Sequence, residues 1–395
     1  MSIETLLSVL GVVFASGVLI WIADYADRRH ARWARWTVRL IVWGMALVYL
    51  LIGVGDLLFA YADPKSADAP SVSVAWRGFA LSVLLAMGSV ALTFAAVRHR
   101  LTRIFPAYRP HVPVAPTAEA ETPPSLTSQE GELLFPQQLG YFTDRTARAS
   151  VPVAQPAAMS APNPTVRGFN PQSEVHALAA ILIVGALGEQ FMSFVLGGGL
   201  SGVAEEFASG ISIGDLLINA LPMVLLPFIG VGLGTRRTWR QALQRLGLER
   251  LSWDSVRLAL GVTFALLLWL VFVGMLWQML VPNDLFEKQT QASDALANSV
   301  TTLGVAFTLA ATAAVGEEIT FRGALQPVFG FWPTALCFTL FHAQYTFTPA
   351  WLLIFGVAVA LGWVRQRYNT TTSILTHFLY NFVQLLIAIS VPAFF

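Results

Sequence analysis

The sequence predicts an all-α, polytopic integral membrane protein, a helical bundle with about ten transmembrane helices. Its residues are 55% hydrophobic and only 12% charged, whereas soluble domains carry about 25% charged residues. The mean hydropathy is +0.63. Many apolar runs approach about 20 residues, the length that crosses a bilayer as a helix. The runs do not alternate in polarity, as the strands of a membrane barrel would, and this favours helices.

The apolar runs follow one another along most of the chain. They lie near 5–23, 40–62, 78–97, 177–198, 214–234, 257–281, 300–322, 331–346, 350–364 and 371–393. Arginines follow the first, third, fifth and ninth runs, while the alternate loops carry acids. The positive-inside rule therefore predicts ten spans with both chain ends outside. We expect an integral protein of the bacterial inner (cytoplasmic) membrane.

The segment 104–175 breaks this pattern. Proline recurs there among Ala, Thr, Ser and Gln, and no apolar periodicity is present. Such composition is typical of a disordered linker, here on the cytoplasmic side. The predicted organisation is therefore a three-helix membrane unit over 1–103, a Pro/Ala-rich disordered linker over 104–175, and a seven-helix unit over 176–395.

Composition also limits the partners of the protein. The formal net charge is +1, so no bulk electrostatic attraction to nucleic acid is expected. No basic cluster alternates with aromatic residues in the way single-strand binding requires. The single cysteine, Cys337, excludes an internal disulfide and a cysteine-based metal cage. The expected partner is membrane lipid, and not nucleic acid.

The most informative stretch is Gly316-Glu317-Glu318-Ile319-Thr320-Phe321-Arg322, at the end of an apolar run. An ionisable group at mid-bilayer depth costs roughly 3 kcal/mol on insertion scales, so charges here indicate a structural or catalytic role. Glu318 and Arg322 are four apart, with the acid first, which favours an ion pair on one helical face. Glu317 is rotated by about 100° from that face. We interpret Glu318–Arg322 as a structural brace and Glu317 as the working group.

Three further polar residues lie inside apolar runs. His342 lies in the run at 331–346, and His377 and Asn381 lie in the last run, four residues apart on one helical face. The other four histidines fall in loops or at membrane edges. In the predicted topology Glu317, His342 and His377 all lie in or near the cytoplasmic half of the membrane. Three helices could therefore bring them together in one site.

These residue types suit hydrolysis of an amide bond. A carboxylate beside an imidazole can hold and deprotonate a water molecule. A histidine and an asparagine on one face can donate hydrogen bonds to a developing oxyanion. Alternatively, Glu317, His342 and His377 could ligate a divalent metal such as zinc, with one position open for water. The His-Glu-x-x-His signature is absent, and the residues leave the cofactor open between none and a metal.

Other functions also fit single residues. Each histidine and Asn381 could serve helix packing alone, in a non-proteolytic membrane scaffold. Asp56, Glu189 and Asp215, which lie in or near apolar runs, could belong to a proton-coupled transporter. Only the combination of Glu317, His342, His377 and Asn381 favours an enzyme.

At these residues the sequence resembles the CPBP family of intramembrane proteases, which includes the type II CAAX prenyl endopeptidases and bacterial Abi-type proteins. The family pattern is two glutamates followed by an arginine, then Phe-x-x-x-His, then His-x-x-x-Asn or Asp, each on its own helix. Here the elements are Glu317-Glu318…Arg322, Phe338…His342 and His377…Asn381. Any one element is a weak signal, whereas the ordered set is specific. The match is specific over about 317–381 and extends plausibly back to 176.

The resemblance implies an intramembrane endopeptidase with its active site toward the cytoplasmic leaflet. Glu317 and His342 would activate the attacking water, and His377 and Asn381 would stabilise the oxyanion. Supporting positions would be Glu318, Arg322 and Phe338. The substrate would be a peptide or a membrane-anchored protein. The family is described both as glutamate-dependent and as metalloprotease, and it includes bacteriocin-immunity proteins, which keeps a non-proteolytic role as the alternative.

Overall fold

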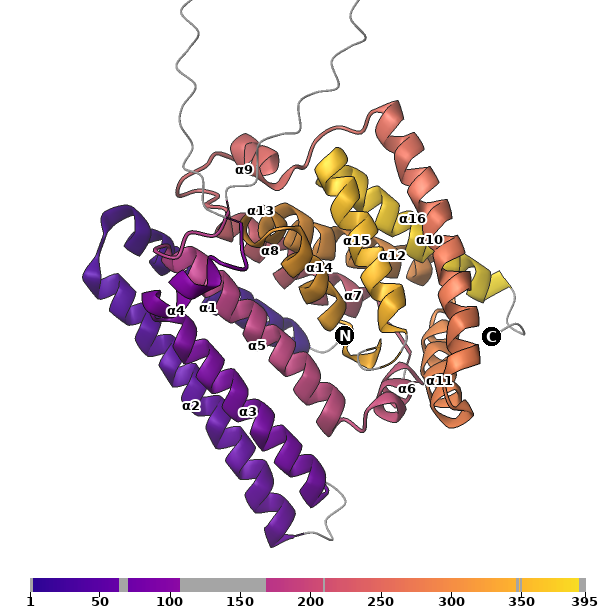
Figure 1. Cartoon of the computed structure of the whole chain (residues 1–395), viewed down its shortest axis with the longest axis horizontal. Coiled ribbons are helices and arrows are strands. Elements are labelled where there is room, and N and C mark those ends of the chain that lie inside the picture. The colour runs from indigo at the N-terminus through magenta and orange to yellow at the C-terminus, as the bar shows by residue number, and fades with distance from the viewer. Residues whose placement is uncertain are drawn as a thin grey trace, which may run out of the picture. The chain divides into compact units, whose positions relative to one another are not determined.

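The computed structural model describes residues 3–63, 70–106, 168–208, 210–345, 348 and 350–390 (Figure 1). Their regular structure is helical, apart from one isolated bridge between Leu233 and Arg237. The predicted all-α fold is confirmed. Most of the predicted linker 104–175 lies outside the described residues, so its disorder and the three-part division of the chain stay predictions.

Eight helical segments in the described residues are long and apolar enough to cross a membrane. They are α1 (Ile3–Arg29), α2 (Arg32–Ala62), α3 (Val72–Leu92), α5 (Glu174–Leu196), α7 (Ile213–Asn219) together with α8 (Leu221–Gly230), α10 (Trp253–Leu280), the segment Leu303–Phe329 that begins with α12 (Leu303–Glu318), and α16 (Thr370–Ser390). Each matches one predicted apolar run. These eight helices give the polytopic bundle its membrane-spanning part.

The two remaining predicted runs form shorter helices. They are α14 (Phe331–Leu340), with 10 residues, and α15 (Trp351–Arg367), with 17 residues. A helix of ten residues is about 15 Å long, half of the hydrocarbon core of a bilayer. Helix α14 therefore cannot cross on its own, and the expectation of about ten spans becomes eight candidates and two shorter helices. The other helices in the described part of the chain are α4 (Ala95–Leu101), α6 (Leu200–Ala208), α9 (Trp239–Leu246), α11 (Asn283–Ser299) and α13 (Gln326–Phe329).

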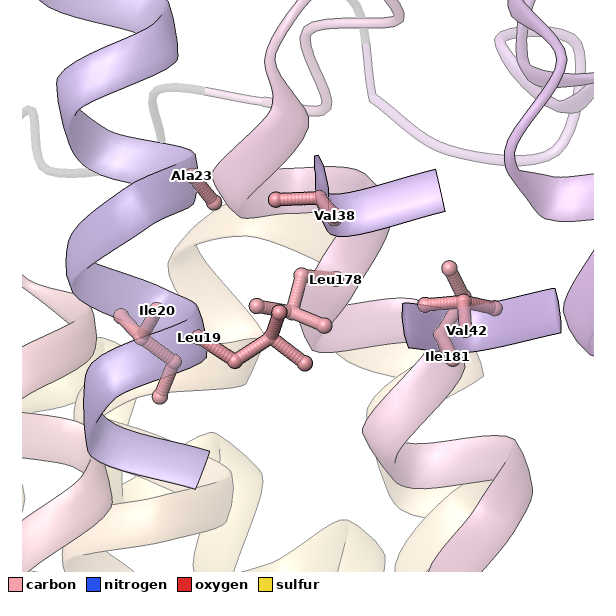
Figure 2. Close-up of a cluster of buried hydrophobic side chains, with 7 residues drawn as sticks. All are labelled: Leu19, Ile20, Ala23, Val38, Val42, Leu178 and Ile181. Carbon is pink, nitrogen blue, oxygen red and sulfur yellow. The ribbon is translucent and has the colours of Figure 1, made fainter. Parts of the chain in front are cut away.

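An apolar cluster joins the N-terminal helices to α5. Its buried side chains come from three helices, as Figure 2 shows: Leu19, Ile20 and Ala23 of α1, Val38 and Val42 of α2, and Leu178 and Ile181 of α5. These aliphatic side chains are buried because all three helices pack closely against one another. Residues 1–109 and 165–395 accordingly form one compact unit.

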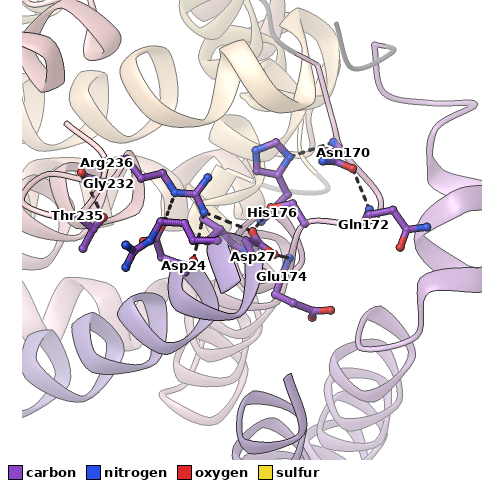
Figure 3. A network of polar contacts seen from close by, with 12 residues as sticks. Asp24, Asp27, Asn170, Gln172, Glu174, His176, Gly232, Thr235 and Arg236 are labelled. Carbon is purple, nitrogen blue, oxygen red and sulfur yellow. Dashed lines mark hydrogen bonds and ion pairs between the residues drawn. The ribbon is translucent and has the colours of Figure 1, made fainter. Parts of the chain in front are cut away.

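A carboxylate from α1 binds the first residues of α5. The side chain of Asp27 accepts hydrogen bonds from the Ser173 hydroxyl at 2.7 Å and from the Glu174 backbone N–H at 2.8 Å (Figure 3). The first N–H groups of a helix lack intrahelical partners and attract a negative charge. Arg236, which follows α8, pairs with both Asp24 and Asp27. This network ties α1, α5 and the segment after α8 together.

A second ion pair, between Arg98 and Glu174, lies wholly inside the protein. The Arg98 side chain is 1% exposed and its Nη2 atom lies 3.3 Å from Oε1 of Glu174. Its Nε atom donates to the Pro171 carbonyl oxygen at 2.7 Å. A buried arginine is tolerated when such partners satisfy it. The pair fixes α4 against the start of α5.

Helix α12 continues into a π-helix, η1 (Ile319–Leu325), where the sequence predicted a regular helix through 322. At its end the backbone N–H of Gln326 donates to the carbonyl oxygen of Phe321, five residues earlier. Gly323 lies so close to α9 that a Cβ atom there would be 3.1 Å from the Leu246 carbonyl oxygen. π-Helical turns are rare and occur frequently at functional sites. This one directly follows the two adjacent glutamates.

Candidate active site

Glu318, the last residue of α12, is the centre of a buried polar network. Its side chain is fully buried and accepts three hydrogen bonds. Oε1 accepts from Nη1 of Arg322 at 2.9 Å and from Nδ1 of His377 at 3.0 Å. Oε2 accepts from the Ser373 hydroxyl at 2.6 Å. The predicted Glu318–Arg322 ion pair is therefore present, and it extends to two residues of α16.

The guanidinium group of Arg322 packs on an aromatic ring as well as on the carboxylate. Its central carbon lies 4.1 Å from the ring centroid of Phe338, an arrangement in which the ring face attracts the cation. Its Nη2 atom donates to the Ala358 carbonyl oxygen at 3.2 Å. Arg322 itself is 1% exposed. The residue therefore joins η1 to α14 and α15 in the interior of the protein.

Both predicted site histidines contact the same phenylalanine. The Phe338 ring centroid lies 5.0 Å from that of His342 and 6.1 Å from that of His377. His342 follows the end of α14 and is not inside a membrane-crossing helix, because α14 ends after ten residues. Its Nδ1 atom lies 3.0 Å from the Phe338 carbonyl oxygen. Phe338 thus contacts Arg322 and both imidazole rings.

The hydrogen bonds of the histidines decide which ring nitrogen carries a proton. A backbone carbonyl oxygen can only accept, so Nδ1 of His342 carries the proton and Nε2 is an acceptor in the neutral ring. A carboxylate paired with arginine also only accepts, so Nδ1 of His377 is protonated as well. Nε2 of His377 can therefore donate a hydrogen bond only when the ring is an imidazolium. In both residues Nε2 is the nitrogen left for a reactant.

Glu317 and Asn381 lie next to this network without joining it by hydrogen bonds. Glu317 is half-buried in the last turn of α12, and its Oε2 atom is buried with no hydrogen-bond partner among the described residues. Asn381 is half-buried in α16, one helical turn after His377. Its side chain makes no hydrogen bond to another described residue. The structure thus brings Glu318, Arg322, Phe338, His342 and His377 into contact, and places Glu317 and Asn381 beside them in sequence on α12 and α16.

The side chains as placed do not fit a metal centre. Among the described residues no group of three or more His, Cys, Asp or Glu side chains is arranged to hold a metal ion. The carboxylate that contacts His377 belongs to Glu318 and is already bound by Arg322 and Ser373. A zinc site made of Glu317, His342 and His377 therefore stays a prediction without support from this geometry.

The three acids considered for a transporter lie on three helices. Asp56 is in α2, Glu189 is exposed on α5, and Asp215 is in the first turn of α7. No hydrogen bond or ion pair joins any two of them within the described part of the chain. No direct contact therefore supports the transporter alternative at these residues.

Sequence reasoning missed two side chains of the network. The Ser373 hydroxyl contacts Glu318, and Nε of Arg365 donates to the Arg322 carbonyl oxygen at 3.2 Å. A signal for Ser373 was present, because it precedes His377 by four residues and shares its helical face. Arg365 follows an apolar run and was counted only as a loop charge. Its partner carbonyl belongs to the π-helix, which the sequence did not predict.

The fold and this site define a polytopic helical membrane protein with a carboxylate, an arginine and two histidines gathered around one buried phenylalanine. Residues 299–383, from the end of α11 to within α16, match the family described as type II CAAX prenyl endopeptidase Rce1-like. The match confirms the predicted resemblance to the CPBP/CAAX protease family for this segment, and it supports the coarse expectation of a CAAX-type intramembrane endopeptidase. No curated protein and no solved structure matches the chain.

Proposed function

We propose that the protein cleaves a peptide bond with a water molecule that Glu317 deprotonates and His342 orients, while His377 and Asn381 stabilise the oxyanion. One observation carries this proposal. The Glu318 carboxylate holds Nδ1 of His377 at 3.0 Å, and Glu317 is the adjacent residue on α12. Both glutamates and both histidines fall in the segment that matches the protease family.

In the proposed hydrolysis, Glu317 carries one proton from the attacking water to the leaving amine. Glu317 takes a proton from water as the water oxygen attacks the carbonyl carbon of the substrate. The carbonyl oxygen becomes an oxyanion, and its charge is met by hydrogen-bond donors. The proton on Glu317 then passes to the amide nitrogen as the carbon–nitrogen bond breaks. The products are a carboxylic acid and an amine.

His342 is suited to hold the water. Its Nδ1 proton is engaged by the Phe338 carbonyl oxygen, which fixes the ring and leaves Nε2 to accept a hydrogen bond. Phe338, whose ring contacts that of His342, is apolar and 1% exposed. Hydrogen bonds and charges act more strongly in such a low-dielectric setting than in water.

His377 is suited to stabilise the oxyanion when it is an imidazolium, because only then does Nε2 carry a proton. The Glu318 carboxylate accepts from Nδ1 and orients the ring, as the buried carboxylate of a catalytic triad does for its histidine. Asn381 lies on the same helical face and supplies a neutral amide N–H donor. Glu318 is therefore a positioning residue that acts through His377.

The substrate we propose is a peptide or a membrane-anchored protein, reached from the cytoplasmic leaflet of a bacterial inner membrane. The orientation follows from the arginines of the predicted inside loops. We propose a glutamate-type mechanism, because Oε2 of Glu317 is buried without a hydrogen-bond partner among the described residues and is therefore free to act as a base. A metallo-endopeptidase is the alternative subtype within the same family.

The test compares reconstituted wild-type protein with Glu317→Gln and His342→Ala on a library of membrane-anchored peptides. Loss of a general base costs about 10²- to 10⁴-fold, so each variant should lose at least a hundredfold in cleavage rate. Glu205→Gln is the matched control, because Glu205 is exposed on α6. Undiminished cleavage by both site variants would end the proposal.

The rival function is a membrane scaffold or bacteriocin-immunity protein, in which Glu317 and the neighbouring Glu318–Arg322–Ser373 network serve packing alone. The two functions differ in what Glu317→Gln does to the protein. A packing role predicts poor expression and a lower melting temperature. Catalysis predicts a stable protein that does not cleave.

A further inference from the structure

A large cavity lies between the N-terminal helices and the segment that carries the candidate active site. Its volume is about 860 Å³, within the range of small-molecule sites. Residues of α1, α2, α5, α8, α9, η1 and α13 line it. Its apolar wall includes Leu182, Ile183, Leu226, Phe321, Leu325 and Phe341.

The polar lining residues include charged side chains, among which cations outnumber acids. Arginines at 35, 236, 237 and 245 line the cavity together with Asp24 and Asp27. Part of that charge is already neutralised, because Arg236 pairs with both acids, as Figure 3 shows. Asp24 also pairs with Arg28 at 2.8 Å. The Arg35 side chain makes no hydrogen bond or ion pair within the described part of the chain, so the cavity keeps an unmatched positive charge.

The cavity adjoins the candidate active site but is distinct from it. Thr320 and Phe321 line it and follow Glu318 by two and three residues, and Phe341 lines it and directly precedes His342. None of Glu317, His342, His377 and Asn381 is among the lining residues. A molecule in this cavity would therefore touch the backbone segments that hold the site and leave the four proposed catalytic side chains uncovered.

We propose that this cavity binds a lipid with one apolar chain and an anionic head group. The apolar wall would bury the chain, since burial of hydrocarbon is the main source of affinity for such molecules. Arginine matches a carboxylate or a phosphate with paired N–H donors, so Arg35 would bind either head group. A neutral lipid would leave this charge uncompensated.

This assignment gives the N-terminal helices a role. Helix α1 supplies Asp24 and Asp27, and α2 supplies Arg35, while the family match begins only at residue 299. The proposed lipid site is thus built by both parts of the chain. It does not depend on whether the protein cleaves peptides.

The experiment uses the full chain in nanodiscs of phosphatidylcholine, with palmitate that carries a photoreactive diazirine in its chain as the probe. Irradiation followed by peptide mapping should place the label in 182–186 and 320–329. Unlabelled palmitate and lysophosphatidic acid should both displace the probe, which shows that carboxylate and phosphate heads are accepted. Monopalmitoylglycerol, with the same chain and a neutral head, should not. Equal displacement by the neutral lipid would overturn the proposal.

Two variants and a control locate the binding. Arg35→Ala should weaken probe binding about tenfold, the effect of one charged hydrogen bond. Arg32→Ala is the control, because Arg32 is exposed three residues earlier and does not line the cavity. Leu226→Trp fills the apolar wall and should abolish labelling even if Arg35→Ala folds poorly. Equal binding by both arginine variants together with normal labelling of Leu226→Trp would refute the site.

Two further measurements distinguish the lipid site from the proposed protease activity and from a site for lipidated peptides. Glu317→Gln should bind the probe normally, so a failed protease proposal would leave the lipid site intact. A palmitoylated peptide should displace the probe no better than palmitate does. If the peptide is clearly the stronger competitor, the occupant is a lipidated peptide and the assignment of a lipid is wrong.

Discussion

Nδ1 of His377 lies 3.0 Å from Oε1 of Glu318, so the second of the two adjacent glutamates holds the histidine of α16. The same oxygen accepts from Arg322 at 2.9 Å. Glu318 is therefore more than a partner for the arginine one turn later. It fixes the tautomer of His377. Glu318 is therefore the positioning glutamate, and Glu317 is the glutamate that we expect to act as the base.

Glu318→Gln should destabilise the protein far more than Glu317→Gln. The amide removes the negative charge that compensates Arg322, which is 1% exposed, and breaking a buried pair costs about 3–5 kcal/mol. Glu317 has no hydrogen-bond partner on its buried oxygen among the described residues, so its neutral isostere should cost little. Thermal unfolding of both variants in the same detergent measures the difference. Equal melting temperatures would contradict the division of roles.

Ser373→Ala should cost about 1–2 kcal/mol of stability and lower the cleavage rate. The hydroxyl donates to Oε2 of Glu318 at 2.6 Å, and hydrogen bonds to charged groups contribute about 1.5–3 kcal/mol. Thr376→Ala is the control, because that buried hydroxyl on the same helix donates only to the Thr372 carbonyl oxygen, four residues earlier. Chemical denaturation and peptide cleavage assays should rank Ser373→Ala below Thr376→Ala. The reverse order would show that the serine does not support the carboxylate.

Gly247→Ala should be more damaging than Gly234→Ala. Both glycines have a positive φ, +70° and +77°, so both variants meet the same backbone strain. A methyl group at 247 would also lie 2.7 Å from Nη2 of Arg365, whereas nothing lies within 4 Å at 234. The additional clash would displace the arginine that donates to the Arg322 carbonyl oxygen. We expect a lower melting temperature and weaker cleavage for the variant at 247 only.

Arg98→Ala should destabilise the protein by about 3–5 kcal/mol, because it leaves Glu174 buried without its cation. Arg100→Ala, two residues later, changes an exposed side chain and should stay within about 0.5 kcal/mol of wild type. Limited proteolysis of the region 95–101 and thermal unfolding both report the effect. Similar curves for the two variants would mean that the ion pair is not needed to hold α4.

The eight candidate spans follow directly from hydropathy, because the bilayer imposes one requirement on every spanning segment. The backbone must be hydrogen-bonded within the segment and covered by apolar side chains. Helix α14 departs from this rule because one of its faces packs against protein, while Trp332 and Leu336 are exposed on another. Its apolar residues, such as Phe338, pack against Phe321 of η1, with their ring centroids 5.2 Å apart. Apolar composition alone does not distinguish lipid from protein surroundings.

The sequence by itself determined the helical membrane fold, the family-like motifs and the pairing of Glu318 with Arg322, because each depends on residues close together in the chain. Only the tertiary structure decided that His377 and Ser373 bind Glu318, that both imidazoles contact Phe338, and that α1 lines a cavity beside the site. These contacts join residues on different helices, and helix packing fixes them. A helical period describes which face a side chain occupies, but not which helix that face meets.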